Sequence, residues 1–452
     1  MPARLIESLA TTEPLAELFS DRSVLQAMLD FEVALARAEA RAGIVPAAAA
    51  EHIAAVAKAE AFDIPTLTGE IFRAGTAAIP VVKALTEKTR SRAPDAAGFV
   101  HWGATSQDVA DTAIVLLLKR AQPLLANDLD PLEAALAGLS DQHKKTPMLG
   151  RTLMQAAPPV TFGLKAAGWL ASIHRSRTSM DAAFDQALVV QFGGASGTLA
   201  SLGENGIPVT KLLAAELGLG CPEAPWHTQR DRLANLMCCC AVLTGSLGKM
   251  AEDVSLLMQN EVAEAAEPSG PGRGGSSTMP HKRNPVGCSL ALAAARRVPA
   301  LAAAFLSSMV QQHERAVGGW QAEWPVIASI VQSTGLAAAS MKEVAQGLSV
   351  DPGRMRANLD STKGVIFAER AMMLLGAKLG RDIAHKVLEE ATRKSVAQGR
   401  HLAEVLGEMP EVTSRLEPSI LQTLEDPEHY LGSAEAFRQA LLAASNAPKK
   451  NQ

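Results

Sequence analysis

One uninterrupted helical pattern, from Asp231 to about Ala266, constrains the fold more than any other feature of the sequence. The segment contains no proline. Its apolar residues recur every three or four positions, at Leu233, Leu236, Met237, Cys240, Leu243, Leu247, Met250, Val254 and Leu257. This spacing places them in one stripe, and at 1.5 Å per residue the helix would be about 50 Å long. Because a small globule cannot bury such a stripe, we expect a long helical bundle whose subunits also pack against one another.

Other segments have the same helical character. The long ones are residues 111–144, 159–188, 286–312 and 325–348, and Pro123 and Pro131 allow a kink in the first of them. A shorter helix is expected from Asp21 to Gly43, where the glycine is a stop signal. Alternating Val, Ile and Thr patterns are nearly absent, so the sequence predicts an all-α fold.

The lengths of these segments divide the chain into three parts. Helical segments are short up to about Thr105, lengthen after it, and shorten again after the turn sequence Asp351-Pro352-Gly353. We therefore expect an N-terminal helical domain over 1–106, a central long-helix bundle domain over 107–350 and a C-terminal helical domain over 351–452.

The composition excludes several classes of partner. Of the 452 residues, 48% are apolar and 20% are charged, with a formal net charge of -4. Without a basic excess, neither nucleic acid nor an anionic membrane surface is an expected partner. Residues 1–7 lack the apolar region of a signal peptide and no run approaches about 18 apolar residues, so we expect a cytoplasmic protein with no membrane span. Three adjacent cysteines, Cys238 to Cys240, point about 100° apart on a helix and favour core thiols over a metal site.

The most polar interruption of the helical pattern is the segment GGSSTMPHKRNP, from Gly274 to Pro285. Its upstream flank, EPSGPGRGG, is too rich in glycine and proline to be a helix or a strand. The segment therefore predicts a mobile loop, dense in hydrogen-bond donors and positive charge, that suits closing over a small anion. The alternative is an ordinary solvated basic turn.

Two further clusters precede expected helices. HWGATSQD, residues 101–108, offers an imidazole, two hydroxyls and an amide at a helix N-terminus, where free N–H groups favour an anion. The alternative is a capping segment, with Thr105 or Ser106 as N-cap and Asp108 in the first turn. GRTLMQ, residues 150–155, is a weaker indication, because Arg151 is equally explained as a structural ion-pair partner.

The remaining two clusters lie later in the chain. TQRDR, residues 228–232, is either part of a site or a helix N-cap with a charged first turn. In HERAVGGWQAEW, residues 313–324, Glu314 and Arg315 are candidates to pair with each other, while Trp320 and Trp324 suggest a pocket wall. No Walker loop, dinucleotide fingerprint, HExxH motif or spaced CxxC pair is present. We therefore expect side-chain acid/base chemistry on an anionic substrate, with no cofactor and no metal.

The four clusters HWGATSQD, GRTLMQ, TQRDR and HERAVGGWQAEW, in this order on a helical chain that also carries the loop, resemble the fumarase/aspartase superfamily. The resemblance runs from about Phe19 to Asp360, and the loop string is its most specific part. It implies three helical domains and a homotetramer with a twenty-helix core. It also implies that each pocket combines motif regions from three different subunits.

The resemblance further implies roles for individual residues. Ser276 aligns with the catalytic serine, which handles the proton on the carbon next to a carboxylate. Lys282, the second catalytic candidate, and Asn284 align with groups that bind substrate carboxylates. The other candidate substrate contacts are His101, Thr105, Ser106, Thr152, Gln155, His281 and Arg315. His101 and His143, which lies ten residues before Leu153, are further acid/base candidates, but for each a structural or substrate-binding role is favoured over proton transfer.

The chain departs from the superfamily pattern at two positions. Most members carry a histidine where this chain has Leu153, and many pair it with a glutamate where this chain has Ser289. In the family this histidine helps an amine or a hydroxide to leave, and both of these leaving groups need a proton. A carboxylate leaves as a stable anion at pH 7, since its conjugate acid has a pKa near 4. The paired loss therefore favours lactone chemistry, in which the leaving or attacking group is a carboxylate.

Other strings favour the same branch of the superfamily. QFGGASGTLASLG from Gln191, PWHTQRDR from Pro225 and HERAVGGWQAEW from His313 resemble bacterial 3-carboxymuconate cycloisomerases. The resemblance implies conversion of a small tricarboxylate, 3-carboxy-cis,cis-muconate, to 4-carboxymuconolactone in protocatechuate breakdown. Three alternatives stay open: a nitrosuccinate-type lyase that expels nitrite, an adenylosuccinate-lyase-like enzyme, and a helical-bundle protein without activity.

Overall fold

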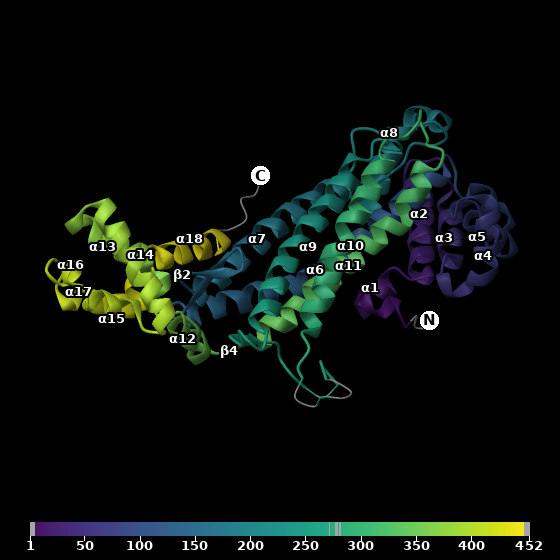
Figure 1. The fold of residues 1–452 in the computed structure, drawn as a ribbon. Coiled ribbons are helices and arrows are strands. Elements are labelled where there is room, and N and C mark those ends of the chain that lie inside the picture. The colour runs from purple at the N-terminus through teal and green to yellow at the C-terminus, as the bar shows by residue number, and fades with distance from the viewer. Residues whose placement is uncertain (1–4, 271, 276–278, 280–281, 447–452) are drawn as a thin grey trace. The chain divides into compact units, whose positions relative to one another are not determined.

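The computed structural model describes residues 5–270, 272–275, 279 and 282–446. Five long helices dominate the fold (Figure 1): α6 (Ser106–Gln142), α7 (Phe162–Ala187), α9 (Asp231–Leu257), α10 (Val286–Ser308) and α11 (Gly319–Gly347). Each lies on one of the five long segments predicted from the sequence, so the predicted all-α class is confirmed. α9 ends nine residues earlier than predicted, because Ala265–Ala266 forms a short strand, β3, instead of helix.

Shorter helices complete the chain. Before α6 lie α1 (Glu13–Leu18), α2 (Asp21–Arg41), α3 (Ala47–Val56), α4 (Ile64–Ala74) and α5 (Ala78–Arg92), and α8 (Gly206–Leu217) precedes α9. After α11 lie α12 (Pro352–Ser361), α13 (Ala368–Leu379), α14 (Arg381–Gln398), α15 (Leu402–Gly407), α16 (Pro410–Thr413), α17 (Pro418–Gln422) and α18 (Ala434–Asn446). β3 pairs antiparallel with β4 (Ser349–Val350).

A β-hairpin that the sequence did not predict lies between α6 and α7. β1 (Pro147–Thr152) pairs antiparallel with β2 (Gln155–Thr161) around a two-residue turn. The turn residues Leu153 and Met154 both have positive φ angles, 49° and 66°. Such turns favour Asn-Gly or Asp-Gly, and β2 contains two prolines, so neither the turn nor the strand carried its usual sequence signature.

The contacts divide the chain into two compact units, and the long helices contribute residues to both. Unit 1 contains Met1–Asp130, Ser176–Gly248 and Leu290–Ala339. Unit 2 contains Pro131–Arg175, Lys249–Ser289 and Ser340–Gln452. The division into three domains with boundaries near residues 106 and 350 stays a prediction.

The core of unit 1 is built on α2. Its residues Leu29, Phe31 and Leu35 are buried among side chains of α3, α5, α6 and α8. The same helix also buries two carboxyl groups, those of Glu32 and Glu39. Within this unit α9 packs on α11, where Thr244 and Thr334 share a hydrogen bond of 3.1 Å.

The core of unit 2 is formed by the helices after α11 and by the hairpin. Leu149 of β1 packs with apolar residues of α12 to α15, including Leu359, Leu375 and Leu406. β1 also lies against α12. The hairpin is therefore held at its base, while its turn projects from the unit, with Leu153 96% exposed.

Two long helices are apolar and long enough to cross a membrane by length and composition alone. Within the most apolar 18-residue segment of each helix, 56% is buried in α9 but only 28% in α10. The sequence had predicted no such run. More than half of the apolar segment of α9 is therefore buried in the core of the protein. Much of the apolar surface of α10, by contrast, is exposed in a single chain.

Candidate active site

The first polar cluster caps α6 in unit 1. The backbone N–H of Thr105 donates to Asp108 Oδ2 at 3.0 Å, which is the back-bond of a capping box. The same carboxylate accepts from the backbone N–H groups of Gly193 and Gly194 at 3.0 and 2.9 Å, and lies 2.7 Å from His227 Nε2. The predicted capping role is therefore present, and Asp108 also ties the glycine-rich segment after α7 to the start of α6.

A fully buried charge cluster lies one turn further along α6. Arg230 donates to both oxygens of Asp111, at 2.7 and 3.0 Å, and to Glu323 Oε2 at 2.6 Å. All three side chains are 0% exposed. Trp320 Nε1 also donates to Asp111, at 3.1 Å. Burial raises the pKa of Glu323, and the neighbouring Arg230 opposes that rise. The cluster joins Asp111 of α6 to residues of two sequence motifs, TQRDR and HERAVGGWQAEW.

Arg315 completes this arrangement. Its Nε donates to Gln107 Oε1 at 3.1 Å, and its Nη2 donates to the carbonyl of Ala195 at 3.2 Å. Gln107 in turn donates to the carbonyl of His227 at 2.8 Å. Arg315 therefore binds α6 and the segment after α7, and the expected alternative of a pair with Glu314 is not what the structure shows. Through Gln107 the guanidinium is held at the start of α6, where Thr105 and Ser106 are both half-buried.

His101 stands just before this helix start. Its Nδ1 lies 2.7 Å from Glu32 Oε1, and its ring is 19% exposed. Its φ of 60° is uncommon for a residue other than glycine. Burial by itself lowers the pKa of His101, but the carboxylates of Glu32 and Asp108 outweigh it, and the pKa is raised. Unit 1 thus brings together four predicted contact residues: His101, Thr105, Ser106 and Arg315.

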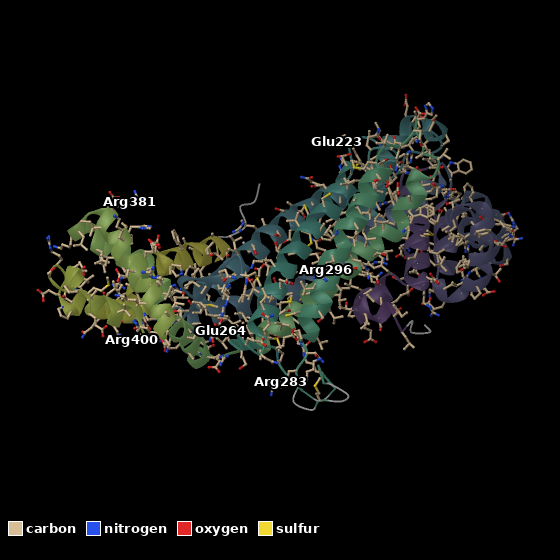
Figure 2. All side chains as sticks on the ribbon, viewed as in Figure 1. Glu223, Glu264, Arg283, Arg296, Arg381 and Arg400 are labelled. Carbon is tan, nitrogen blue, oxygen red and sulfur yellow. The ribbon has the colours of Figure 1, made fainter. Side chains whose placement is uncertain are left out.

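The second motif lies on the hairpin of unit 2. Thr152 and Gln155 are exposed and face each other across the turn. Arg151 makes a bidentate ion pair with Glu264, at 2.7 and 2.9 Å, and Asn358 donates to the same carboxylate at 2.7 Å. Glu264 is labelled in Figure 2 and its side chain is 0% exposed. Arg151 is therefore a structural ion-pair partner, which was one of the two roles that the sequence left open for it.

The loop of unit 2 is tied at both ends. The backbone N–H of Asn284 donates to the carbonyl of Gly274 at 3.0 Å. Gly274 has a φ of 64°, and a Cβ there would lie 2.8 Å from the carbonyl oxygen of Asn284. Glu267 accepts from the backbone N–H groups of Gly287 and Cys288, at 3.0 and 2.7 Å, and so caps α10 with a buried carboxylate.

Within this loop, Ser276 and His281 lie outside the described residues. Lys282 is exposed and Asn284 is half-buried. Ser289, at the position where many superfamily members have a glutamate, donates its hydroxyl to the carbonyl of Pro285 at 2.6 Å. Its side chain is thus engaged with its own helix.

His143 has a structural environment. It is 7% exposed, its Nδ1 lies 3.2 Å from Thr146 Oγ1, and its ring meets Phe162 edge-on at 5.3 Å. Burial lowers its pKa. These contacts favour the structural role that the sequence suggested.

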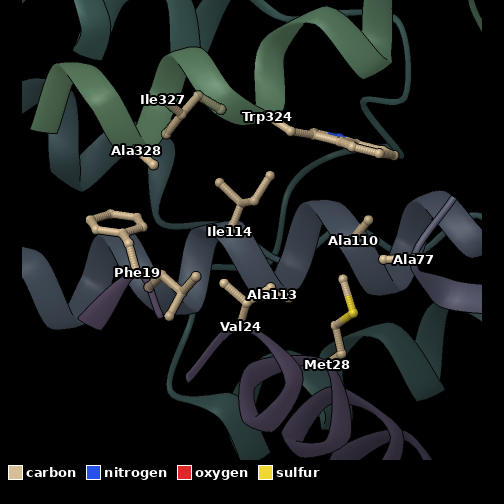
Figure 3. A pocket seen from close by; sticks show the side chains of 11 residues that line it. Phe19, Val24, Met28, Ala77, Ala110, Ala113, Ile114, Trp324, Ile327 and Ala328 are labelled. Atoms are coloured by element: carbon tan, nitrogen blue, oxygen red, sulfur yellow. The ribbon is translucent and has the colours of Figure 1, made fainter. Parts of the chain in front are cut away.

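The two tryptophans of the fourth cluster have different surroundings. Trp324 lines a pocket of about 260 Å³ in unit 1, together with apolar side chains such as Phe19, Met28 and Ile114 (Figure 3). Trp320 is instead buried against the charge cluster. The predicted pocket wall is correct for Trp324, but the pocket is apolar and unsuited to an anion.

The sequence did not predict the partners of several buried polar residues around the candidate site. Asp111, Arg230, Glu323, His227 and Glu32 are buried polar residues whose partners lie far away in the sequence. Arg230, Glu323 and His227 lie in or next to the polar clusters, whereas Asp111 and Glu32 lie outside them. For these two, local periodicity could have flagged only their burial, since both fall on the apolar faces of their helices. Among the described residues, no group of three or more His, Cys, Asp or Glu side chains is placed to hold a metal ion.

Comparisons with known proteins fit this arrangement. Residues 7–300 match a lyase family model, and residues 364–441 match the adenylosuccinate lyase C-terminus. A 3-carboxy-cis,cis-muconate cycloisomerase of Bradyrhizobium diazoefficiens is 49% identical over 93% of this chain and 94% of its own. A nitrosuccinate lyase of Streptomyces davaonensis is 42% identical over 95% of this chain and 92% of its own.

Solved structures agree in fold over nearly the whole chain. The crystal structure of 3-carboxy-cis,cis-muconate lactonizing enzyme from Pseudomonas putida matches with a TM-score of 0.93 and 45% identity, over 98% of this chain and 99% of that one. A family model over more than half of the chain, near-full-length relatives and a shared fold lead to one conclusion. The chain belongs to the lyase family of the fumarase/aspartase superfamily.

Proposed function

We propose that the protein is a cycloisomerase that converts 3-carboxy-cis,cis-muconate to 4-carboxymuconolactone, a step of protocatechuate breakdown by the β-ketoadipate pathway. The observation that carries the proposal is the 49% identity, over 93% of the chain, to a relative named for this reaction. The residues at positions 153 and 289 support it, because neither Leu153 nor Ser289 can protonate a leaving group as a histidine–glutamate pair would.

The chemistry needs one C–O bond and one proton. A carboxylate oxygen of the substrate adds to the conjugated double bond, and the electron pair moves onto another carboxylate as an aci-carboxylate. Ser276 then delivers its proton to the adjacent carbon and regains one from solvent. No leaving group needs protonation at any step, in agreement with the residues at positions 153 and 289.

The residues around the substrate would hold its three carboxylates. Lys282 and Asn284 at the end of the loop would stabilise the developing dianion. Arg315, held by Gln107 at 3.1 Å, would add a fixed positive charge. The remaining proposed contacts are His101, Thr105, Ser106, Thr152, Gln155 and His281. A concentration of cationic groups in these motifs explains how a chain with a net charge of -4 binds a trianion.

We propose further that the active form is a homotetramer whose central helices form the twenty-helix core, with pockets shared between subunits. The apolar window of α10 is only 28% buried in one chain, and Val242 on α9 and Leu306 on α10 are 61% and 45% exposed. Burying such surface drives association. These helices would then pack against other copies rather than enter a membrane, and we place the enzyme in the cytoplasm.

A substrate panel tests the function. The purified protein is incubated with 3-carboxy-cis,cis-muconate, nitrosuccinate, adenylosuccinate and argininosuccinate, while muconate absorbance, nitrite and fumarate are followed. We expect rapid loss of muconate absorbance and formation of the lactone. Strong cleavage of adenylosuccinate or argininosuccinate would overturn the leaving-group argument, and turnover of none of the four would favour an inactive helical bundle.

The second candidate function is nitrosuccinate cleavage. A relative named for it is 42% identical over 95% of the chain, and nitrite, like a carboxylate, leaves without a proton. Nitrite release by the wild type in the panel would favour this second candidate. Leu153→His tests the leaving-group argument that the two candidates share. We expect the variant to keep lactonisation within about threefold, because a lactone-forming step makes no use of an added acid.

A further inference from the structure

The pair formed by Glu32 and His101 is a polar contact of unit 1 that the chemistry above does not use. Glu32 lies in the middle of α2, its side chain is 0% exposed, and its Oε1 is 2.7 Å from His101 Nδ1. This distance is typical of a charge-assisted hydrogen bond. The other ring nitrogen of His101, Nε2, has no hydrogen-bond partner among the residues that the structure describes.

We propose that Glu32 is a positioning residue that holds His101 as a cationic hydrogen-bond donor for one carboxylate of the substrate. The proposal rests on the proposed function, because it needs an anionic substrate at the start of α6. Glu32 fixes the ring through Nδ1 and leaves the Nε2–H free to donate. A ring bonded to a carboxylate in this way has a defined orientation and tautomer.

The energetic cost of the pair favours a functional role. A carboxylate buried in an apolar core loses its hydration. One ion-pair partner offsets this desolvation energy only if both carboxylate oxygens also have good hydrogen bonds. Glu32 Oε2 has no partner in the described part of the chain. His101 adds the strain of a positive φ, 60°. An apolar residue at position 32 would serve packing better, so stability alone does not explain this pair.

The charges around His101 support its protonation. The groups that face it are Glu32 from α2 and Asp108 from the first turn of α6, and together they outweigh the effect of burial and raise its pKa. Glu39, two turns further along α2, is also buried, and burial first and Glu32 second raise its pKa to about 9. Glu39 is therefore neutral at pH 7, and Glu32 supplies the charge from α2.

The test compares Glu32→Gln with Glu39→Gln, a matched change of another buried glutamate on the same helix that does not touch His101. The first readout is the pKa of His101 itself, measured from the slow exchange of its imidazole C2 hydrogen for deuterium by mass spectrometry. We expect Glu32→Gln to lower this pKa by about one unit or more, the scale of a lost close charge partner. Glu39→Gln should leave it unchanged.

The second readout is the kinetics on 3-carboxy-cis,cis-muconate between pH 6 and 9. At pH 7.5 we expect Glu32→Gln to raise KM about tenfold while kcat changes less than threefold, which is the signature of lost binding. The KM should recover as the pH is lowered and His101 regains its proton. Glu32→Asp, which keeps the charge, should restore part of the affinity, and in a His101→Asn background Glu32→Gln should have no further effect.

The outcomes separate this inference from the proposed function. If the wild type does not turn over the muconate, the function is wrong. If it does, but Glu32→Gln leaves both the His101 pKa and the KM unchanged, the positioning role is wrong. A fall in kcat and thermal stability in Glu32→Gln without a change of KM would show a structural role only. Should Glu32→Gln fail to fold, Glu32→Asp and the His101→Asn variant carry the comparison.

Discussion

The polar core of unit 1 and the hairpin and loop of unit 2 present polar side chains in opposite ways. In unit 1, Arg230, Asp111 and Glu323 are 0% exposed and satisfy one another. In unit 2, Thr152, Gln155 and Lys282 are exposed on a turn and a loop whose ends are fixed. The buried groups are fixed by one another, whereas the exposed groups of unit 2 are accessible to a substrate or, in the proposed tetramer, to another subunit.

This contrast separates stability from chemistry. Buried charged groups that lack a partner are costly, so changes in the polar core should be measured as lost folding free energy. Groups on an exposed loop have little folding energy to lose, so changes there should appear in turnover. Each experiment below tests one side of that division.

The largest effect should come from the loop. Ser276→Ala removes the proposed proton donor, and general acid/base groups contribute about 10²–10⁴-fold to rate, or about 2.7–5.4 kcal/mol. We expect kcat to fall by that factor with the melting temperature unchanged. Ser289→Ala is the control, because among the described residues its hydroxyl has one partner, the carbonyl of Pro285. Turnover of Ser276→Ala within about threefold of wild type would show that the serine is not the proton donor.

The next effect tests the polar core. Arg230→Met leaves Asp111 and Glu323 buried without their cation, and breaking a buried ion pair costs about 3–5 kcal/mol. Arg232→Met, two residues away, is the matched control, since Arg232 is 28% exposed and pairs with Glu223, which is 89% exposed. That loss should stay within about 1 kcal/mol. Chemical denaturation of the two variants checks the difference, and equal losses would mean that the buried cluster does not stabilise unit 1.

The sequence predicted the long helices well because their apolar residues repeat within one segment. α2 and α10 begin where predicted, and α6, α7 and α11 begin within six residues. The hairpin escaped because its turn is Leu153-Met154 rather than a residue pair that favours positive φ. Local patterns show burial and period, but they carry no information about a partner on another element.

The candidate site shows the same division. Its loop and clusters could be recognised because their residues are contiguous in the sequence. The partners of Arg230 and Arg151 could not, because Asp111 lies 119 residues from the former and Glu264 lies 113 residues from the latter. Sequence spacing therefore left the role of Arg151 open, and it marked Arg230 only as part of a cluster with two possible roles, without its buried partners.

The third effect is a pH dependence of unit 1. Burial raises the pKa of Glu39 from 4.5 to about 9. Between these values the folded protein keeps a proton that the unfolded chain has lost. The stability from this group is therefore complete below pH 4.5 and falls by about 1.4 kcal/mol per pH unit above it.

Glu39→Gln removes this dependence. From about pH 6 to about pH 8 the wild type should lose about 2.7 kcal/mol more stability than the variant. Glu51→Gln is the control, because Glu51 is exposed and its pKa is lowered by Arg37, so it does not titrate in this range. Melting temperatures of the three proteins at both pH values check the prediction, and parallel curves for wild type and Glu39→Gln would contradict it.

The smallest effect concerns the hairpin turn. Leu153 and Met154 hold positive φ angles while 96% and 74% exposed, an arrangement that costs about 1 kcal/mol per residue for an L-amino acid. The double substitution Leu153→Asn with Met154→Gly introduces the residue pair that such a turn favours. After the entropy of the new glycine in the unfolded chain is subtracted, we expect a gain of about 1 kcal/mol in folding free energy, measured by chemical denaturation.

The same double change tests why the turn keeps unfavourable residues. If the turn completes a pocket of another subunit, KM should rise several-fold although the protein is more stable. Lys363→Gly is the control, since Lys363 is exposed with a φ of 52° and lies outside all four sequence clusters. It relieves one strained residue instead of two, so it should bring a smaller gain in stability, with unchanged kinetics. Unchanged kinetics in the hairpin variant as well would show that the exposed turn of unit 2 contributes nothing to catalysis, and the contrast with unit 1 would then rest on the loop alone.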